Sequence, residues 1–354
     1  MTTVNKFTFF GIGFGFLFPF ISMLIEVWFR FGFFSLSSFF SIHKNNPLLW
    51  VIDTAPLFLG IFARMAGKRQ EAINDLNYQL ENSIKELRIE IARSNTIENN
   101  IRDLVEIYKK DLQSAKLIQE FSLPEIPKFT QFEIIYKYIP LNPVGGDLIS
   151  LRKIDSGLLS ILVGDVVGHG ISAALIASLV NVLANKNQEK NGLFPKRYLE
   201  FLNTEANNYL PEDYYFTAIY GLLSSTNDST KFTFSRGGHP YPFVYSSSEK
   251  VAKIYEIAGT PLGLMHNLTY EELSIDLFPK DRIFIITDGF IEVKNEKGRL
   301  LGNKNFCNFI TEACNQNLTL EDSISYILNK VDEFSINMPP DDDRFILGIE
   351  INST

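Results

Sequence analysis

The stretch LLSILVGDVVGHGISAALIA, residues 158–177, decides how the rest of the chain is interpreted. A mostly apolar run reaches Asp165, a glycine-rich turn follows, and an apolar segment with helical spacing begins at Ile171. This pattern predicts a buried strand, a tight turn and a helix. The Asp165 carboxylate would therefore be held at a strand end, where its oxygens can meet a ligand.

Similar strand-like runs fill the sequence after residue 130. They are FEIIYKYI, YFTAIYGLL, KFTFSR, PFVYS, RIFIITDG and RFILGIEI, beginning at residues 132, 215, 231, 242, 282 and 344. Helical patterns interrupt them at 171–186, 194–209 and 303–330, the last long enough for two helices. Strands with a few helices, but without strict alternation, predict an α+β or layered sandwich fold.

Further aspartates share the setting of Asp165, each beside a strand-like run. They are Asp147 in PVGGD, Asp288 in IFIITDG, and Asp341, Asp342 and Asp343 before the final strand. Clustered carboxylates without a Cys and His set favour oxygen-preferring divalent ions, Mg²⁺ or Mn²⁺. Two such ions close together are the usual machinery of phosphoester hydrolysis.

The overall composition narrows the classes of partner. The 354 residues include 33 Lys or Arg and 41 Asp or Glu, which gives a net charge of −8. An acidic total without a basic run argues against a nucleic-acid partner. The two cysteines, Cys307 and Cys314, cannot form a disulfide framework and are typical of reduced thiols.

Residues 1–66 are predicted to form a membrane module with two spans, at about 7–25 and 48–65. Residues 7–25 carry no charge, and a helix of that length measures about 28 Å, close to the hydrocarbon thickness. Residues 48–63 are apolar except for Asp53. The basic residues Arg64, Lys68 and Arg69 follow, so the positive-inside rule places both ends of the module in the cytoplasm.

These features predict a multi-pass protein of the inner (cytoplasmic) membrane with its remaining residues in the cytoplasm. A cleaved signal peptide is disfavoured by the long first run and by the second run behind it. A buried hairpin of a soluble protein is the other alternative, because the second run is slightly short for a span.

Residues 67–122 are predicted to form a signalling helix. Apolar residues recur about every 3.5 positions, the period of a coiled coil, which favours a parallel homodimer. The seam consists of Ile73, Leu76, Leu80, Ile84, Leu87, Ile91, Ile97, Ile101, Leu104, Tyr108, Leu112 and Ala115. A single amphipathic helix folded back on the next domain is the alternative. Pro124 and Pro127 end the helix, so the last domain is placed at 123–354.

One ordered series of motifs covers most of that domain. It comprises GGD, GDVVGHGISAALIA, FTAIYG, SRGGHPYPFVY, GTPLGL, RIFIITDGFIEVKNEKGRLLG and DDDRFIL. From about residue 132 to residue 351 the chain closely resembles the SpoIIE/RsbU branch of the PPM (type 2C) metal-dependent serine/threonine phosphatases. The resemblance implies a β-sandwich flanked by helices, with two divalent cations, Mn²⁺ or Mg²⁺, between the sheets.

The resemblance also implies roles for individual residues. Asp165 would bridge both ions, the carbonyl of Val166 would bind one, Asp288 and Asp342 would bind the other, and Asp147 would act through bound waters. Asp165 and Asp147 would thus be the catalytic pair. Supporting positions would be Gly146, Gly168, His169, Gly170, Gly289 and Asp343. His169 is interpreted as either a residue that orients its turn or a general acid.

Two departures from the family pattern affect the site. Phe345 stands where the family usually has Thr, which leaves the choice among Asp341, Asp342 and Asp343 open by one register. The phosphate-binding Arg of eukaryotic members has no secure counterpart.

The expected function is that of a membrane-anchored phosphoserine/phosphothreonine phosphatase, in which water activated by two metal ions attacks phosphorus. The resemblance implies that its substrate is a phosphorylated regulator of the anti-sigma-antagonist type. The main alternative is a catalytically silent phosphatase-like sensor or binding module. A sensor histidine kinase is disfavoured because residues 68–120 contain no histidine.

Overall fold

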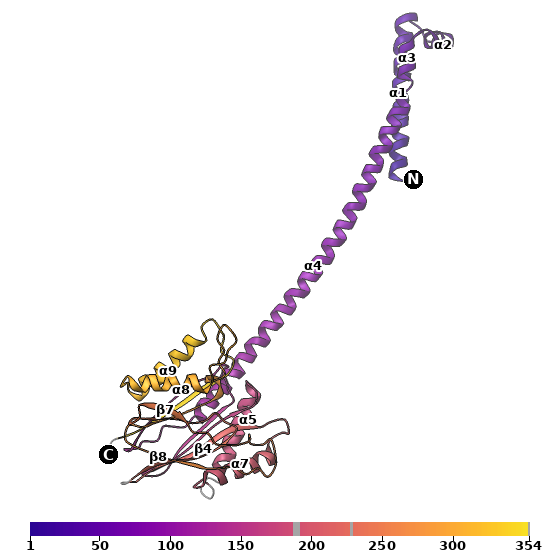
Figure 1. Ribbon diagram of the computed structural model, residues 1–354. Coiled ribbons are helices and arrows are strands. Elements are labelled where there is room, and N and C mark those ends of the chain that lie inside the picture. Colours follow the sequence, from indigo (N-terminus) through magenta and orange to yellow (C-terminus); the bar gives the residue numbers. More distant parts are fainter. Residues whose placement is uncertain (187–191, 227–228, 353–354) are drawn as a thin grey trace. The chain divides into compact units, whose positions relative to one another are not determined.

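The computed structural model describes residues 1–186, 192–226 and 229–352. The chain divides into two compact units, Met1–Leu104 and Val105–Thr354, and each is considered by itself. Figure 1 labels some of the elements of both units.

The first unit consists of helices. They are α1 (Thr3–Phe31), α2 (Leu36–Asn45), α3 (Pro47–Ile52) and the first part of α4 (Ala55–Ser122). By length and composition, α1 and the α3–α4 segment are apolar enough to cross a membrane, and most of their side chains are exposed. The predicted second span is not one uninterrupted helix, because the chain turns at Asp53 and Thr54 between α3 and α4.

Small residues bring α1 and α4 close together within this unit. A Cβ on Gly11 would collide with Ala63, and a Cβ on Gly15 would collide with the backbone of Pro56. On the other helix, a Cβ on Gly60 would lie only 2.6 Å from the Ile12 side chain. Close backbone approach through small residues, with Gly11 and Gly15 spaced as G-x-x-x-G, is typical of packed membrane helices.

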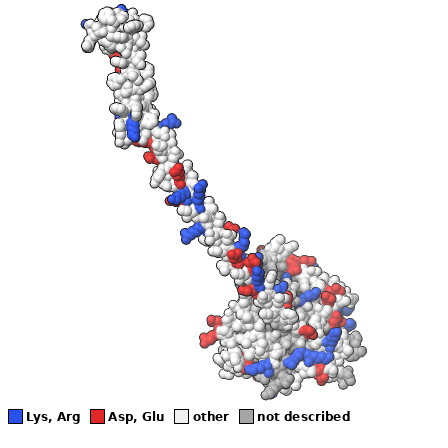
Figure 2. Space-filling model, turned by 180° about the vertical axis from the view of Figure 1, so that it is seen from behind, with Lys and Arg blue, Asp and Glu red and all other residues white. Residues whose placement is uncertain are grey.

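Helix α4 is continuous from Ala55 to Ser122 and therefore passes through the boundary predicted at residue 66. It ends two residues before Pro124, as the sequence predicted. Lys, Arg, Asp and Glu of both signs alternate along it, whereas the surface formed by α1–α3 is almost free of charge (Figure 2).

The second unit contains two antiparallel five-stranded sheets (Figure 1). The first has, in spatial order, β1 (Phe132–Ile139), β10 (Arg344–Ile351), β9 (Arg282–Ile286), β6 (Phe243–Ser246) and β7 (Val251–Ile254). The second has β2 (Asp147–Asp155), β3 (Leu158–Val166), β4 (Phe216–Ser225), β5 (Thr230–Gly237) and β8 (Leu273–Leu277).

Apolar side chains from both sheets, such as Ile161, Ile285 and Leu347, form the core between them. Two further cores lie under the flanking helices. Helices α5 (Ile171–Lys186) and α7 (Pro195–Tyr209) cover the second sheet, while α8 (Gly302–Asn315) and α9 (Leu320–Phe334) cover the first. The predicted α+β sandwich flanked by helices is confirmed.

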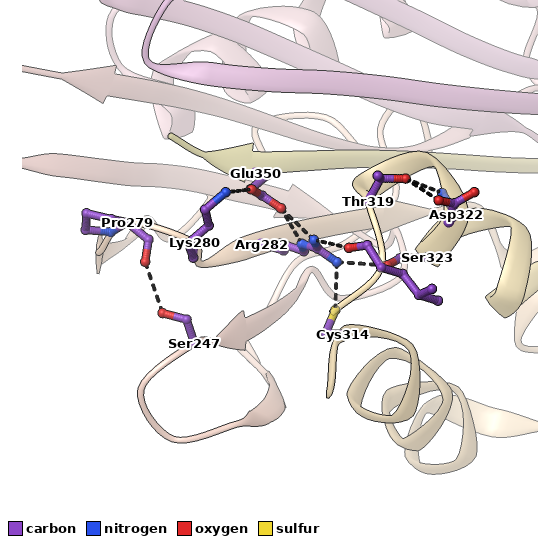
Figure 3. A network of polar contacts seen from close by, with 10 residues as sticks. Ser247, Pro279, Lys280, Arg282, Cys314, Thr319, Asp322, Ser323 and Glu350 are labelled. Carbon is purple, nitrogen blue, oxygen red and sulfur yellow. Dashed lines mark hydrogen bonds and ion pairs between the residues drawn. The ribbon is translucent and has the colours of Figure 1, made fainter. Parts of the chain in front are cut away.

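A buried ion pair ties α8 and α9 to the first sheet (Figure 3). Arg282 Nε on β9 donates to Glu350 Oε2 on β10 at 2.7 Å. The same guanidinium donates to Ser323 Oγ at 2.8 Å and to the Leu318 carbonyl at 2.7 Å. Both charged side chains are almost fully buried, so their charges are balanced inside the protein.

Candidate metal centre

Two aspartates come from neighbouring strands of the second sheet. Asp147 begins β2, Asp165 lies near the end of β3, and the two residues are directly opposite each other in the antiparallel register. The pairing therefore places two carboxylates side by side at one sheet edge.

The first sheet supplies two more carboxylates. Asp288 begins a single 3-10 turn (Asp288–Phe290) after β9, and Asp342 precedes β10, the neighbour of β9. Asp165, Asp288 and Asp342 each offer an oxygen, and these three atoms lie within 4.8 Å of one another. Three half-buried carboxylates from two sheets thus meet at one point, where a divalent cation would balance their charge.

The three consecutive acids before β10 have different surroundings. Asp341 is exposed and pairs with Lys294 at 2.9 Å. Asp343 accepts hydrogen bonds from the backbone N–H groups of Leu141 (2.7 Å) and Gly146 (2.9 Å). Only Asp342 among these three acids joins the carboxylate cluster.

Glycines leave room for the cluster at two points. A Cβ on Gly146 would lie 3.0 Å from the Val166 carbonyl oxygen and 3.2 Å from Asp165 Oδ1. A Cβ on Gly289 would collide with the carbonyl of Asp343. The Val166 carbonyl oxygen and the Asp165 carboxylate therefore both lie close to Gly146.

The turn after β3 depends on two glycines. Gly168 and Gly170 have φ values of 94° and 79°, a region that L side chains rarely adopt. His169 between them is exposed. Burial raises the pKa of the neighbouring Asp343, whereas the backbone hydrogen bonds from Leu141 and Gly146 lower it. The turn thus brings the chain from Asp165 into α5 within a few residues.

Asp147 has an unfilled hydrogen-bonding position. Its Oδ2 accepts from Thr287 Oγ1 at 3.4 Å, and Thr287 Oγ1 in turn accepts from the Phe345 N–H at 3.0 Å. Its Oδ1 is buried without a hydrogen-bond partner in the described part of the chain, as is one oxygen of Asp288. Sequence reasoning missed Thr287, although the hydroxyl within the TDG triplet was a signal.

Tyr138 on β1 is a second residue that sequence reasoning missed. Its buried hydroxyl has no hydrogen-bond partner among the described residues. Burial, followed by the negative charges of Asp343 and Asp147, raises its pKa, so the phenol stays protonated. A neutral hydrogen-bond donor therefore faces the acidic cluster. In the sequence it was simply one aromatic residue of a strand.

His239 lies beneath the site rather than in it. Its ring nitrogen Nδ1 is 3.0 Å from the hydroxyl of Thr217, which pairs with Asp165 across the sheet. Complete burial, followed by the charge of Arg236, lowers the pKa of His239 to about 3. The imidazole is therefore neutral and supports β4 next to β3.

The carboxylates repel one another in the absence of a cation. Burial, followed by the charges of Asp288 and Asp342, raises the pKa of Asp165 to about 8. Burial, followed by Asp342 and Glu292, raises the pKa of Asp288 to about 6. Burial and the charge of Asp165 also raise the pKa of Asp147 well above its ordinary range. Bound cations would relieve this repulsion.

The metal-free protein should therefore lose thermal stability as the pH rises from about 5 to about 8. In this window the folded Asp165 and Asp288 hold protons that the unfolded chain, with pKa values near 4, has released. Mn²⁺ should reverse the loss, and more strongly at the higher pH, because ligand carboxylates must be deprotonated. Thermal unfolding with chelator or Mn²⁺ measures both effects.

The Asp165→Asn variant is the control for this prediction, because it lacks the titrating group with the higher pKa. A chelated protein whose melting temperature rises through this window, relative to the variant, would contradict the prediction.

Comparison with known proteins assigns this chain to a family. Residues 155–352, more than half of the chain, match the family model described as Stage II sporulation protein E (SpoIIE). The chain belongs to the SpoIIE family. Three of the clustered acids, Asp165, Asp288 and Asp342, fall inside the matched segment, and Asp147 lies just before it.

Individual relatives of this SpoIIE-family chain agree with the assignment. Phosphoserine phosphatase RsbU of Bacillus subtilis is 26% identical over 201 residues, 56% of this chain and 59% of RsbU. Phosphoserine phosphatase RsbP of the same organism is 27% identical over 188 residues, 52% of this chain and 46% of RsbP. The matches thus span only about half to three fifths of these relatives.

The sandwich of this family member also resembles a solved structure. The SiaA-PP2C domain of Pseudomonas aeruginosa superposes with a TM-score of 0.59 at 20% identity, covering 70% of this chain and 97% of that domain. This likeness shows the fold.

Proposed function

We propose that the chain is a membrane-anchored, metal-dependent phosphoserine/phosphothreonine protein phosphatase. The observation that carries this proposal is the meeting of Asp165, Asp288 and Asp342 oxygens within 4.8 Å at the junction of two sheets. The names of RsbU and RsbP, phosphoserine phosphatases, support the same reaction class.

The residues present fit divalent cations. Every candidate ligand is an oxygen, which suits Mn²⁺ or Mg²⁺. The oxygens of Asp147 and Asp288 that have no partner among the described residues leave positions for ligands or their waters. When bound, two such cations supply Lewis-acid activation of water and neutralise charge on the phosphoryl oxygens. Asp165, Asp288, Asp342, Asp147 and the Val166 carbonyl would hold them.

The remaining residues of the site orient these groups. Thr287 holds one oxygen of Asp147, and Asp343 fixes the loop that carries Gly146. The Tyr138 hydroxyl is available to donate a hydrogen bond to a phosphoryl oxygen or to an ordered water. This hydroxyl would partly compensate for the lack of a secure counterpart to the phosphate-binding Arg of eukaryotic family members.

The proposed substrate is a phosphorylated regulatory protein of the anti-sigma-antagonist type. Its support is the resemblance to the RsbU branch, which covers the catalytic domain. A catalytically silent binding module is the rival, and the retention of all four carboxylates favours the enzyme.

Phosphate release by the full-length chain in detergent tests the enzyme proposal. A chromogenic aryl phosphate and a phosphoserine peptide would be incubated with Mn²⁺, with Mg²⁺ and with chelator. Turnover that requires a divalent cation is the expected result. Mn²⁺ binding by calorimetry without turnover of either substrate would favour the silent module.

The first unit would provide the anchor. The mostly apolar surface of α1–α3 and the close contacts at Gly11 and Gly15 support two membrane-embedded helices, α1 and the start of α4. The basic residues Arg64, Lys68 and Arg69 support a cytoplasmic catalytic domain at the inner membrane. Retention in the membrane fraction after alkaline carbonate extraction is expected, and release would contradict the anchor.

The apolar seam of α4 would pair with that of a second copy. Leu80, Leu87 and Ile91 are more than half exposed in the single chain, at 56%, 56% and 58%, and a parallel dimer would bury them.

We expect Leu87→Lys to shift the detergent-solubilised chain from dimer to monomer, because a charge would enter the middle of the seam. Ile89→Lys is the matched control: Ile89 is also exposed but lies two positions along, on another face of the helix. Light scattering coupled to gel filtration gives the mass. Equal masses for both variants would contradict pairing through this seam.

A further inference from the structure

The last turns of α4 contact the loop that leads into the metal centre. Gln119 Nε2 donates to the Gly145 carbonyl at 2.8 Å, and the Gly145 N–H donates to Gln119 Oε1 at 3.0 Å. One side-chain amide thus satisfies both backbone groups of a single residue. Such a two-point contact fixes orientation as well as distance.

Gly145 has little freedom on its other side. A Cβ there would collide with Asp343 Oδ2 and the Tyr138 hydroxyl. The next residue, Gly146, donates its N–H to Asp343 Oδ2 at 2.9 Å and accepts from the Val166 N–H at 3.2 Å. Asp147 then follows directly. The loop is therefore held from α4 on one side and from the metal centre on the other.

The apolar side chains two residues to either side of Gln119 are largely exposed. Leu117 and Phe121, two residues to either side of Gln119, are 57% and 90% exposed. Gln119 itself is half-buried against the loop. Its two hydrogen bonds therefore form a specific connection between this end of the helix and residues 145–147.

We propose that Gln119 is a positioning residue that fixes the 145–147 loop and thereby sets the affinity of the site for its cations. The proposal rests on the proposed metal-dependent function and adds the means by which α4 acts on it. Without the amide, binding a cation would also have to order the loop, so the apparent affinity falls. A displacement of α4 would act on the same site through this contact.

The test compares Gln119→Met and Gln119→Ala in the full-length chain. Met keeps the length of the side chain but makes neither hydrogen bond. We expect both variants to bind Mn²⁺ about tenfold more weakly by calorimetry. Activity at saturating Mn²⁺ should return to that of the unchanged chain. The melting temperature of the chelated protein should fall only slightly, because the two hydrogen bonds to the buried Gly145 are lost. Gln113→Met, at an exposed position of the same helix, is the control and should behave like the unchanged chain.

Unaltered Mn²⁺ affinity in Gln119→Met would overturn the proposal, even if Gln119→Ala were weakened, because packing rather than hydrogen bonding would then be responsible. A lower melting temperature with unchanged Mn²⁺ affinity would overturn it too. Failure of the proposed function looks different, since the unchanged chain itself would not release phosphate, whether or not it bound Mn²⁺.

Discussion

Replacing Asp165 with Asn should lower Mn²⁺-dependent phosphate release by about three orders of magnitude, equivalent to about 4 kcal/mol of transition-state stabilisation. Asp165 faces Asp147 across the β2–β3 pair and meets Asp288 and Asp342 from the other sheet, so it is the carboxylate common to both halves of the site. Asn preserves its shape but removes the charge and one oxygen.

The same variant has a second readout that does not depend on turnover. Removing one charge from a cluster of buried like charges relieves repulsion, so chelated Asp165→Asn protein should melt at a higher temperature than the unchanged chain at pH 8. Asp276→Asn is the matched control, because Asp276 is an exposed strand residue on β8 paired with Lys231. Near-normal turnover with Asp165→Asn would refute the assignment of the centre.

Replacing Arg282 with Met should destabilise the second unit by about 3–5 kcal/mol, because Glu350 would remain as a buried charge whose guanidinium partner is gone. The Ser323 hydroxyl and the Leu318 carbonyl would also lose their donor, which loosens α9 from the sheet. At about 2–4 °C per kcal/mol, the melting temperature should fall by roughly 6–20 °C. Scanning calorimetry of the full-length chain measures this.

Two further variants separate the cost of leaving a buried charge unpaired from the cost of losing the hydrogen bonds of the guanidinium. Adding Glu350→Leu to Arg282→Met removes both charges and should recover most of the stability. Lys280→Met removes the other partner of Glu350, but Lys280 is 62% exposed, so a loss of only about 1 kcal/mol or less is expected. A double variant as unstable as Arg282→Met would show that the guanidinium acts mainly through its hydrogen bonds to the α8–α9 connection.

Local sequence signals were sufficient to predict the bounds of those elements whose own residues determine their conformation. Strands β1 and β10 and helix α5 have the predicted bounds, because long apolar runs end at clear polar or glycine signals. Strands β2, β7 and β8 were not predicted. β2 carries charged residues over its second half, and the other two have only four and five residues, so their pairing with neighbours defines them.

The residues of the site divide in the same way, into those that the local sequence identifies and those that only distant contacts identify. Asp165 and Asp288 could be placed at strand ends from local pattern alone. The distinction between Asp342 and Asp343 could not, because it depends on backbone N–H groups at Leu141 and Gly146 about 200 residues earlier in the chain. Tyr138 and Gln119 acquire their importance only through contacts with distant residues, which no local periodicity encodes.

The carboxylates on the two sheets are joined through the apolar layer that separates those sheets and through a few hydrogen bonds, such as those from Thr287 to Asp147 and from Gly146 to Asp343. Asp147 and Asp165 move with the β2–β3 pair, whereas Asp288 and Asp342 move with β9 and β10. The thickness of that layer, to which side chains such as Ile161 and Ile285 contribute, would therefore influence the size of ion that the proposed site accepts. Mg²⁺ requires oxygens at about 2.0–2.1 Å and Ca²⁺ at about 2.3–2.6 Å. For the proposed enzyme, the discrimination between ions would thus depend on the packing of its hydrophobic core as well as on its acidic ligands.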